Sequence, residues 1–447
     1  MAKEPRVKVA IHGYYGFHNV GDEAILSVIL EELRREVPNV EPVALSADPV
    51  WTEQLHGVKA VNSHDLKEVA ACIREADLVI SGGGGLFQEY WPRDNAEMLA
   101  FPAEGGAYYA QVPLLAKLYG KPLALLAHGI GPIRTQEGAN LVRVVSGIAD
   151  RITVRDEGSQ KLLERLGRAE KVVHLAPDPA FAFPIPPRDE ARKLLAESIG
   201  LPLDPSQTVI AVCVRPWQEE SLDWPERLAE GLDRFLADTD TLAVFVPFHE
   251  FEHNSDVAQG KSIIEGMSQH DRCFALRETP PADVAAILAG CDAVLAMRLH
   301  AAIFAIAAGV PVLALAYDPK VSEAMRQAGQ AENTLQLHAL DPQNVAAGLR
   351  KLLDQAAPIP SLQKTASKLA SQVRAHFTGL EELARQQDAL PAGFQPAQPP
   401  PPRDHNRARL AAERQLEQTR SALTRHVTDL QFQLDEAEKR SQDYFDD

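Results

Sequence analysis

Cysteine is scarce in this chain of 447 residues, which contains only Cys72, Cys213, Cys273 and Cys291. The four lie far apart, mostly in apolar surroundings, and no two of them form a CxxC pair. This spacing argues against a zinc cluster or a redox pair built from neighbouring thiols. In a chain of this length, buried free thiols are a better interpretation than a disulfide framework.

Long uninterrupted hydrophobic runs are also missing. The longest apolar stretch, residues 301–317, contains the turn-forming sequence Gly309-Val310-Pro311, and it therefore predicts a helix, a turn and a strand instead of a membrane span. The first residues, MAKEPRVKVAIHG, lack the apolar core and cleavage site of a signal peptide. We therefore expect a cytoplasmic protein.

Positive charge is in deficit. The chain has 45 Lys and Arg against 62 Asp and Glu, for a formal net charge of −17. A general nucleic-acid binder needs a basic footprint, and adsorption to anionic lipid by bulk charge needs the same. We therefore expect no nucleic-acid partner, and any small anionic substrate would need a local cationic pocket.

Strand and helix patterns alternate along most of the chain, which predicts parallel sheets covered by helices. The predicted strands are residues 7–12, 40–46, 76–81, 122–127, 152–154, 208–214, 241–246, 293–296 and 312–316. The predicted helices are residues 24–35, 66–75, 159–166, 222–236, 282–288, 301–308, 344–355 and 362–387.

The Pro-rich sequence FPIPPR (residues 183–188) divides this pattern into two Rossmann-like, doubly wound α/β domains, residues 1–185 and 186–388. Ligands bind at the carboxyl ends of such sheets, so the two domains are expected to face one cleft.

The C-terminal region has a different composition. Residues 389–403 are rich in proline and predict a stiff linker. In residues 404–447, apolar side chains recur at spacings of seven, four and three, which is typical of a coiled-coil seam. This helical tail is expected to self-associate, giving a homo-oligomer, or to bind a partner helix; a solvated single helix is the alternative.

The segment AMRLHAAIFAIAAGVPVLALAYDPKV (residues 296–321) places Arg298, His300 and Lys320 at the ends of an apolar block. Arg and Lys are almost never buried without a partner. At the junctions between strands and helices, these three residues suit an anion-binding, acid–base site. The alternatives are a structural ion pair for Arg298 and a core position for His300.

The loop sequence GYYGFHNVGDEAIL (residues 13–26) joins the first strand to the first helix. Asn19, Asp22 and Glu23 suit a helix N-terminus, and Asp22 or Glu23 would accept a proton from a sugar hydroxyl. Simple helix capping is the alternative. The sequence is neither a GxGxxG nor a Walker motif, so it does not indicate a nucleotide cofactor.

The glycine-rich sequence SGGGGLFQ (residues 81–88) follows a predicted strand. Consecutive glycines, Gly84 among them, leave backbone N–H groups open to an anion or a sugar hydroxyl, and Gln88 would contact the sugar. A tight packing turn is the alternative. The sequence HGIGP (residues 128–132) is interpreted as a third loop of the same kind.

Arg155 and Arg215 each follow a predicted strand and would fork onto a carboxylate or phosphate. For Arg155 the alternative is a local ion pair with the next two residues. Asp178 also lies at a strand end, where a structural role is sufficient. His249 and His253 lie four positions apart, beside Glu250 and Glu252, and would chelate a metal only with a distant third ligand, so no metal site is predicted.

Taken together, these motifs resemble the polysaccharide pyruvyl transferase family, CsaB type. The resemblance spans roughly residues 7–340 and consists of GYYGFHNVGDEAIL, SGGGGLFQ, HGIGP, ITVRDEGS, DPAF, VRPW, MRLHA and YDPKV, in that order. It implies two domains arranged as in the GT-B glycosyltransferases. It also implies transfer of pyruvate from phosphoenolpyruvate onto a sugar as a cyclic ketal.

The resemblance implies a particular acceptor, the N-acetylmannosamine of a lipid-linked cell-wall polymer precursor, whose pyruvylation anchors S-layer proteins. A lipid-linked acceptor places the reaction at the inner face of the cell membrane, with peripheral contact as the expectation. Phosphoenolpyruvate is a co-substrate, and no other cofactor is expected. Residues 89–109 depart from the family's usual continuation, which bears on the acceptor more than on the chemistry.

The predicted site divides into three groups. His300 is the predicted general acid/base, and its protonation would depend on donor binding. The residues predicted to bind phosphoenolpyruvate are Arg155, Arg298, Lys320 and Arg215. Those predicted to bind the acceptor, on the N-terminal domain, are Asn19, Asp22, Glu23, Gly84 and Gln88. The alternative functions are a nucleotide-sugar glycosyltransferase of GT-B type and a non-catalytic scaffold for wall assembly.

Overall fold

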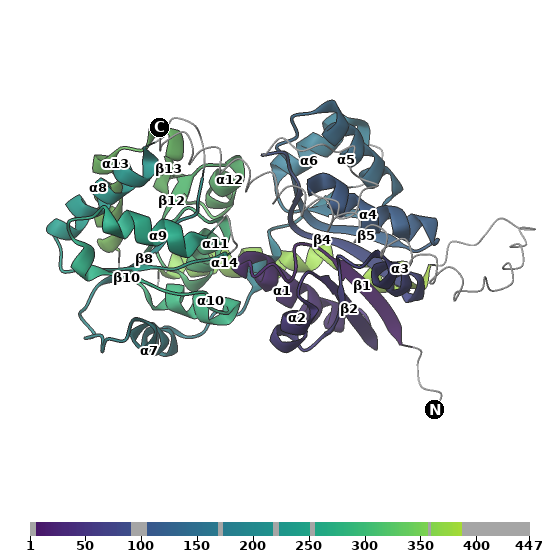
Figure 1. The fold of residues 1–447 in the computed structure, drawn as a ribbon, viewed down its shortest axis with the longest axis horizontal. Helices are drawn as coiled ribbons and strands as arrows, with labels where there is room; N and C mark the ends of the chain where they lie inside the picture. The colour runs from purple at the N-terminus through teal and green to yellow at the C-terminus, as the bar shows by residue number, and fades with distance from the viewer. Residues whose placement is uncertain are drawn as a thin grey trace, which may run out of the picture. The chain divides into compact units, whose positions relative to one another are not determined.

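The chain folds around two parallel β-sheets, which a computed structural model describes in detail (Figure 1). The described residues are 6–90, 105–168, 173–217, 223–250, 255–355 and 359–386. The predicted linker and coiled-coil tail, and His253 of the histidine pair, lie outside them.

Within these residues the first sheet has seven parallel strands in the order β3-β2-β1-β4-β5-β6-β7. The strands are β1 (Val7–His12), β2 (Val40–Ser46), β3 (Lys59–Asn62), β4 (Leu78–Phe87), β5 (Leu123–Ile130), β6 (Arg151–Val154) and β7 (Val173–Leu175).

The second sheet, counted over the same residues, has six parallel strands in the order β10-β9-β8-β11-β12-β13. The strands are β8 (Val209–Cys213), β9 (Leu242–Phe245), β10 (Cys273–Ala275), β11 (Ala293–Ala296), β12 (Val312–Ala316) and β13 (Thr334–Gln336).

The helices around the first sheet are α1 (Val20–Glu36), α2 (Pro49–His56), α3 (Leu66–Glu75), α4 (Gly105–Leu118), α5 (Gln136–Ile148) and α6 (Glu157–Leu163). Those that follow are α7 (Arg188–Ile199), α8 (Trp224–Ala237), α9 (Asp256–Glu265), α10 (Pro281–Gly290), α11 (Leu299–Ala308), α12 (Pro319–Gln327), α13 (Pro342–Leu353), α14 (Pro360–Gln372) and α15 (Leu380–Arg385). Short helical turns are η2 (Glu164–Arg168), η3 (Pro179–Ala182), η4 (His270–Arg272), η5 (Ala331–Asn333), η6 (Leu337–Ala339) and η7 (Val373–His376).

Alternate residues of each central strand pack into different cores. In β1, Val9 and Ile11 face the core that contains α1, whereas Ala10 faces the core that contains α3, α4 and α5. In β8, Val209 and Ala211 share the core of α1, together with α10 and α11. Burial of both strand faces explains the continuous apolar runs that the sequence shows, and the predicted two-domain α/β class is confirmed.

One hydrophobic core therefore joins the two sheets. Helix α1 packs against α10 and α11, and side chains from all three helices belong to the same buried cluster. At the start of α1, the backbone N–H of Val20 donates to the carbonyl of Phe248 at 2.9 Å. These contacts fix the N-terminus of α1 beside the strand ends of the second sheet.

The glycine-rich sequences are strand, not loop. Strand β4 runs on through Gly82, Gly83 and Gly84, whose φ angles are +154°, +78° and +106°. Positive φ is a conformation that glycine adopts without a steric cost, so the strand continues with an irregular register against β5. Strand β5 likewise includes His128–Ile130, which corrects the prediction of loops at both places.

The expected single helix over residues 362–387 is also wrong. Helix α14 ends at Gln372, and Gly379, with φ +82°, separates the turn η7 from α15. Within η7, His376 makes hydrogen bonds of 2.8 Å to the hydroxyl of Thr153 and to the carbonyl of Pro177. The end of the described chain thus returns to the first sheet and does not complete the second domain alone.

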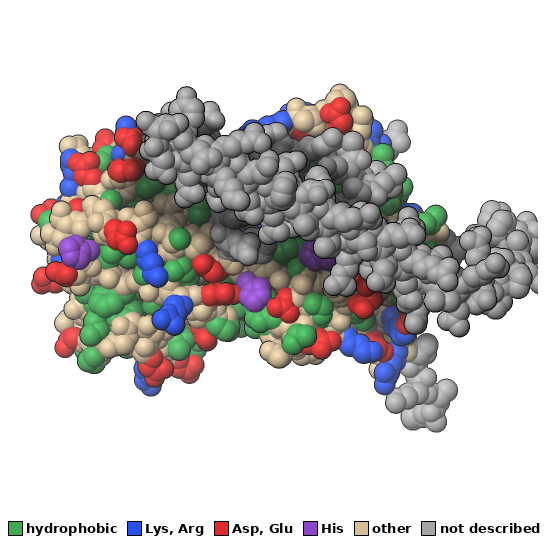
Figure 2. Space-filling view, viewed as in Figure 1, with side chains coloured by type: hydrophobic (Ala, Val, Ile, Leu, Met, Phe, Trp, Pro, Cys, Tyr) green, Lys and Arg blue, Asp and Glu red, His purple; other side chains and the backbone are tan. Residues whose placement is uncertain are grey.

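No helix in the described part of the chain is long and apolar enough to cross a membrane. On the face drawn in Figure 2, acidic and basic side chains of the described residues are intermixed, without a broad basic patch.

Candidate active site

A cavity of about 620 Å³ lies where the carboxyl ends of the two sheets meet. The β1–α1 loop, the end of β4 and the residue after β6 line it from the first sheet. The residues that follow β8, β11 and β12 line it from the second. Parallel sheets bind ligands at this edge, and a cavity of this size accommodates a small-molecule site.

Arg298 precedes α11 and is held by a buried carboxylate. Its Nε donates to Oδ2 of Asp256 at 2.9 Å and its Nη2 donates to Oδ1 of the same residue. Oδ2 of Asp256 also accepts from the backbone N–H groups of Phe248 and His249. Arg298 therefore makes the structural ion pair that was one alternative, and it lines the cavity as well. Sequence reasoning missed Asp256, because it lies 42 residues before its partner.

His300 is the second residue of α11 and lines the cavity. Its ring is packed against the first turn of α1, where a methyl group at Gly21 would overlap its Nδ1 atom. Burial lowers the pKa of His300 to about 4; the carboxylate of Asp178 raises it, and the cations Arg155, Lys320 and Arg298 lower it further. The imidazole is therefore neutral at pH 7, and a bound dianion would raise its pKa.

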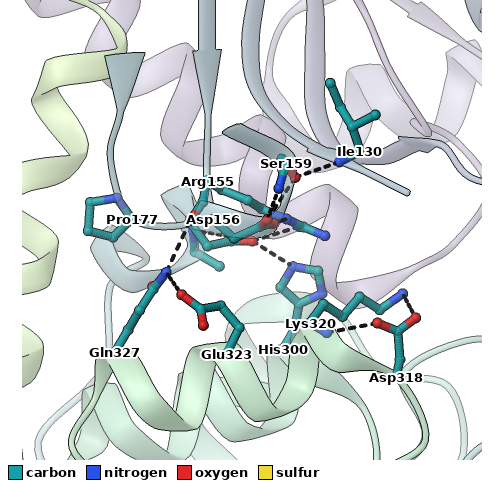
Figure 3. A network of polar contacts seen from close by, with 12 residues as sticks. Ile130, Arg155, Asp156, Ser159, Pro177, His300, Asp318, Lys320, Glu323 and Gln327 are labelled. Atoms are coloured by element: carbon teal, nitrogen blue, oxygen red, sulfur yellow. Dashed lines mark hydrogen bonds and ion pairs between the residues drawn. The ribbon is translucent and has the colours of Figure 1, made fainter. Parts of the chain in front are cut away.

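Arg155, at the end of β6, is buried and bridges to the carboxylate of Asp178 at 2.7 Å. The same carboxylate lies 3.8 Å from Nε2 of His300. Figure 3 shows the side chains of Arg155 and His300 facing each other from the two domains. The network continues to Gln327 of α12, whose side-chain amide donates to the carbonyl of Arg155 at 3.4 Å. Asp178 thus couples the predicted donor cation to the predicted acid/base.

One glycine makes room for the Arg155 guanidinium. A Cβ atom at Gly129 would lie 2.6 Å from its Nε atom, whereas one at Gly85 would lie at the ordinary contact distance of 3.5 Å from Nη2. The first glycine of HGIGP therefore acts on the site by leaving space for this side chain.

Lys320 and Arg215 surround the ring of Tyr317. Nζ of Lys320 lies 5.6 Å from the ring centroid and 3.6 Å from the carboxylate of Asp318. Arg215 donates to the Tyr317 hydroxyl at 3.0 Å and lies over the ring of Trp217 at 5.3 Å. Burial opposes ionisation of Tyr317, but Lys320, Arg215 and Arg298 outweigh it and lower the pKa of the phenol to about 7.

Asp22, in the first turn of α1, lines the cavity with a carboxyl group whose pKa is strongly raised. Burial raises its pKa to about 7; Arg155 opposes this, while Glu23 and Asp178 add to it. A Cβ atom at Gly84 would lie 2.5 Å from Oδ1 of Asp22, so the absence of a side chain at Gly84 leaves room for the carboxylate. Asp22 and His300 therefore differ in pKa by several units within one cavity, as acid–base pairs do.

Of the remaining residues predicted to bind the acceptor, two line the cavity and two do not. Asn19 and Gln88 line the cavity, and Asn19 also caps α1 by accepting from the backbone N–H of Gly21 at 3.0 Å. Glu23 and Gly84 are not among the lining residues. The Glu23 carboxylate instead accepts from the N–H of Gly16 and contacts Nε2 of His56, each at 2.8 Å. Glu23 therefore holds the β1–α1 loop in place from the side away from the cavity.

Sequence reasoning passed over the aromatic residues of the cavity. Tyr317 stands in the YDPK motif, beside a residue that was predicted. Tyr14 and Phe17 lie in the β1–α1 loop, where only polar residues were predicted from the sequence as ligands. Among the described residues, no group of three or more His, Cys, Asp or Glu is placed to hold a metal ion.

Known proteins resemble this chain in sequence and in fold. Residues 19–319 match the family model described as polysaccharide pyruvyl transferase. The chain is 22% identical over 392 residues to the amylovoran biosynthesis protein AmsJ of Erwinia amylovora, covering 78% of this chain and 92% of that protein.

Solved structures with the same fold include a putative UDP-N-acetylglucosamine 2-epimerase from Listeria monocytogenes, with a TM-score of 0.53, 14% identity and coverage of 85% and 94% of the two chains. The UDP-N-acetylglucosamine 2-epimerase from Neisseria meningitidis, bound to UDP-GlcNAc, has the same TM-score and identity, with coverage of 85% and 99%. The fold is therefore GT-B-like, as expected from the sequence.

Proposed function

Because this chain belongs to the polysaccharide pyruvyl transferase family, we propose that it moves pyruvate from phosphoenolpyruvate onto two hydroxyls of one sugar as a cyclic ketal. The family and the relative AmsJ make it a pyruvyltransferase of polysaccharide synthesis. The observation that carries the finer proposal is the convergence of Arg155, Arg298, His300 and Lys320 on the cavity.

Phosphoenolpyruvate presents a carboxylate and a phosphate, and both need cations in a site with little water. Arg298 and Arg155 are pre-positioned by buried carboxylates, which fix the directions of their guanidinium groups. Lys320 and Arg215 stand around Tyr317 on the same cavity. We assign these four cations to the donor.

The reaction needs two proton transfers. Two O–H bonds of the sugar, the C2=C3 π bond of the donor and its C2–O bond to phosphate break. Two C–O bonds form at C2, one C–H bond forms at C3, and one O–H bond forms on the released phosphate. One proton therefore reaches C3, and the other leaves with phosphate. In this proposal Asp22 accepts a hydroxyl proton, and His300 protonates the methylene after the bound dianion has raised its pKa.

The proposed acceptor is the N-acetylmannosamine of a lipid-linked cell-wall polymer precursor. In that setting the enzyme acts at the cytoplasmic face of the membrane, and its product supports S-layer anchoring. AmsJ belongs by name to the synthesis of another polymer, amylovoran, so the acceptor is the part of the proposal that needs the broadest test.

The experiment is acceptor-dependent release of phosphate from phosphoenolpyruvate, measured with a panel of methyl glycosides that includes N-acetylmannosamine. Wild-type protein should release phosphate only when acceptor is present. The His300→Ala variant should lose turnover while it still binds donor, and Lys320→Ala should mainly weaken donor binding. Nucleotide release from a sugar nucleotide, without phosphate release from phosphoenolpyruvate, would replace this proposal with a glycosyltransferase.

A further inference from the structure

Aromatic rings line the side of the cavity formed by the first sheet. We name as the aromatic wall the residues Tyr14 and Phe17 of the β1–α1 loop, His64 of the β3–α3 loop, and Tyr108 and Tyr109 of α4. All five line the same cavity as His300 and the donor cations. They come from three chain segments, so the wall is a product of the fold.

The rings of the wall are in continuous contact. Tyr14 and Phe17 are stacked, with centroids 4.2 Å apart and planes 2° from parallel. Phe17 meets His64 edge to face at 6.0 Å, and His64 stacks on Tyr108 at 5.8 Å. Tyr108 and Tyr109 meet at 5.0 Å. These are the spacings that aromatic pairs prefer, so the rings hold one another in place.

Core packing accounts for only part of the wall: Tyr108 is buried, and Tyr14 and Tyr109 pack against the core on one side. Tyr15, the neighbour of Tyr14, is fully buried and donates its hydroxyl to the carbonyl of Gly82. Tyr14 and Phe17, in contrast, are only half-buried, as are His64 and Tyr109. Large rings left partly exposed in a concave site favour binding of a ligand that covers them.

The chemistry of the wall differs from that of the donor side. None of its five residues is Lys or Arg, so it lacks the permanent cations that the donor side offers to a phosphate or carboxylate. It presents ring faces, whose π-electrons attract C–H groups of partial positive charge, and ring edges with hydroxyl and imidazole groups. A pyranose has matching parts, namely a face of C–H groups and a rim of hydroxyls.

We propose that the aromatic wall is a subsite for a neutral saccharide ring, the one linked to the sugar that receives pyruvate. The proposal rests on the proposed function, because that function brings a polysaccharide precursor to the cavity. The substrate class that follows is an oligosaccharide of at least two rings, in preference to a free monosaccharide.

The test is direct binding to the full chain, by calorimetry and saturation-transfer NMR in the presence of inorganic phosphate. The probes are methyl glycosides of N-acetylmannosamine, N-acetylglucosamine and galactose, each paired with a disaccharide in which that sugar is β-linked to N-acetylglucosamine. For the best-bound pair, the disaccharide should bind roughly tenfold more tightly than its monosaccharide, which a stacking contact can supply. Saturation of aromatic protons should reach one face of the added ring.

Phe17→Leu and His64→Ala should remove most of that tenfold preference and leave monosaccharide affinity within about twofold. Phe17→Tyr, which keeps the ring, should retain it, and Tyr119→Leu, an aromatic outside the cavity, is the matched control. Equal affinity for both probes in wild-type protein, or an unchanged preference in both wall variants, would overturn the subsite. Displacement of the disaccharide by uridine alone would also overturn it, since the wall would then be a nucleobase site.

The outcome is separable from that of the proposed function. A disaccharide preference that depends on Phe17, without any phosphate release from phosphoenolpyruvate, would keep the subsite and reject the pyruvyl transfer. Phosphate release by wild-type protein, with no effect of either Phe17→Leu or His64→Ala on the disaccharide preference, would do the reverse.

Discussion

The close packing of Gly21 against His300 predicts that Gly21→Ala destabilises the wild-type protein but not a variant that lacks the His300 ring. Gly21 lies in the first turn of α1, so Gly21→Ala should stabilise that helix on conformational grounds, by up to about 1 kcal/mol. A methyl group at this position, however, would overlap Nδ1 of the His300 ring. The ring is packed against α1 on one side, so it can yield only toward the cavity that it lines, away from its position in the site.

The magnitude follows from these opposing effects. Overpacking costs about 1–3 kcal/mol, which exceeds the helical gain, so Gly21→Ala should destabilise the wild-type protein by about 1–2 kcal/mol. In the His300→Ala background the space is vacated, and the same substitution should be neutral or stabilising by up to about 1 kcal/mol. The coupling free energy between the two sites is then about 2–3 kcal/mol.

The assay is urea denaturation of the wild type, both single variants and the double variant, followed by acceptor-dependent phosphate release from the wild type and Gly21→Ala. Turnover of Gly21→Ala should fall by about 100-fold, because a displaced imidazole no longer meets the donor in the right geometry. A Gly21→Ala effect on stability of the same sign and size in both backgrounds would show that the two residues are not packed as described.

Three further predictions concern other parts of the site. Asp256→Asn should lower the free energy of unfolding by about 3–5 kcal/mol, because Arg298 loses the carboxylate that holds it in a buried pair; a loss below about 1 kcal/mol in urea denaturation would contradict this. Gly84→Ala should cost about 1–3 kcal/mol from its φ of +106° and should reduce turnover as well, because its methyl displaces the Asp22 carboxylate; unchanged kinetics of phosphate release would count against that packing. Stability should fall as pH drops from 6.5 toward 4, because burial holds the folded-state pKa values of five histidines below their ordinary value of 6.5 and the unfolded chain then binds more protons. Asp22, whose pKa is raised, releases one proton on unfolding in this pH range, so unfolding should still take up protons in total. A stability that does not change with pH would refute the lowered pKa values of the histidines. The five are His12, His128, His249, His300 and His376.

The central strands were predictable from sequence because both of their faces are buried. Strands β1, β11 and β12 have the predicted bounds, and the apolar runs that mark them follow from this burial. Edge strands such as β10 and β13 are short and partly exposed, so they leave no comparable run in the sequence.

The glycine-rich part of β4 was predicted as a loop because local sequence does not reveal that positive φ angles continue a strand. The cavity itself was predictable where motifs lie at strand ends, as with Arg298, His300 and Lys320. The residues that hold them were not, since Asp256 lies far from Arg298 in sequence and carries no motif of its own. Glu23 is the opposite case. Its carboxylate has suitable chemistry for the site, but it contacts Gly16 and His56 and does not line the cavity.

Pyruvyl transfer is tested most simply by NMR of the product formed from phosphoenolpyruvate and the best acceptor in deuterated water. The expected product is a ketal whose methyl group carries one deuterium, formed in equal amount with inorganic phosphate, because one solvent-exchanged proton is delivered to C3. A saccharide that returns without a pyruvyl methyl group, or that carries a sugar from a nucleotide donor instead, would contradict it.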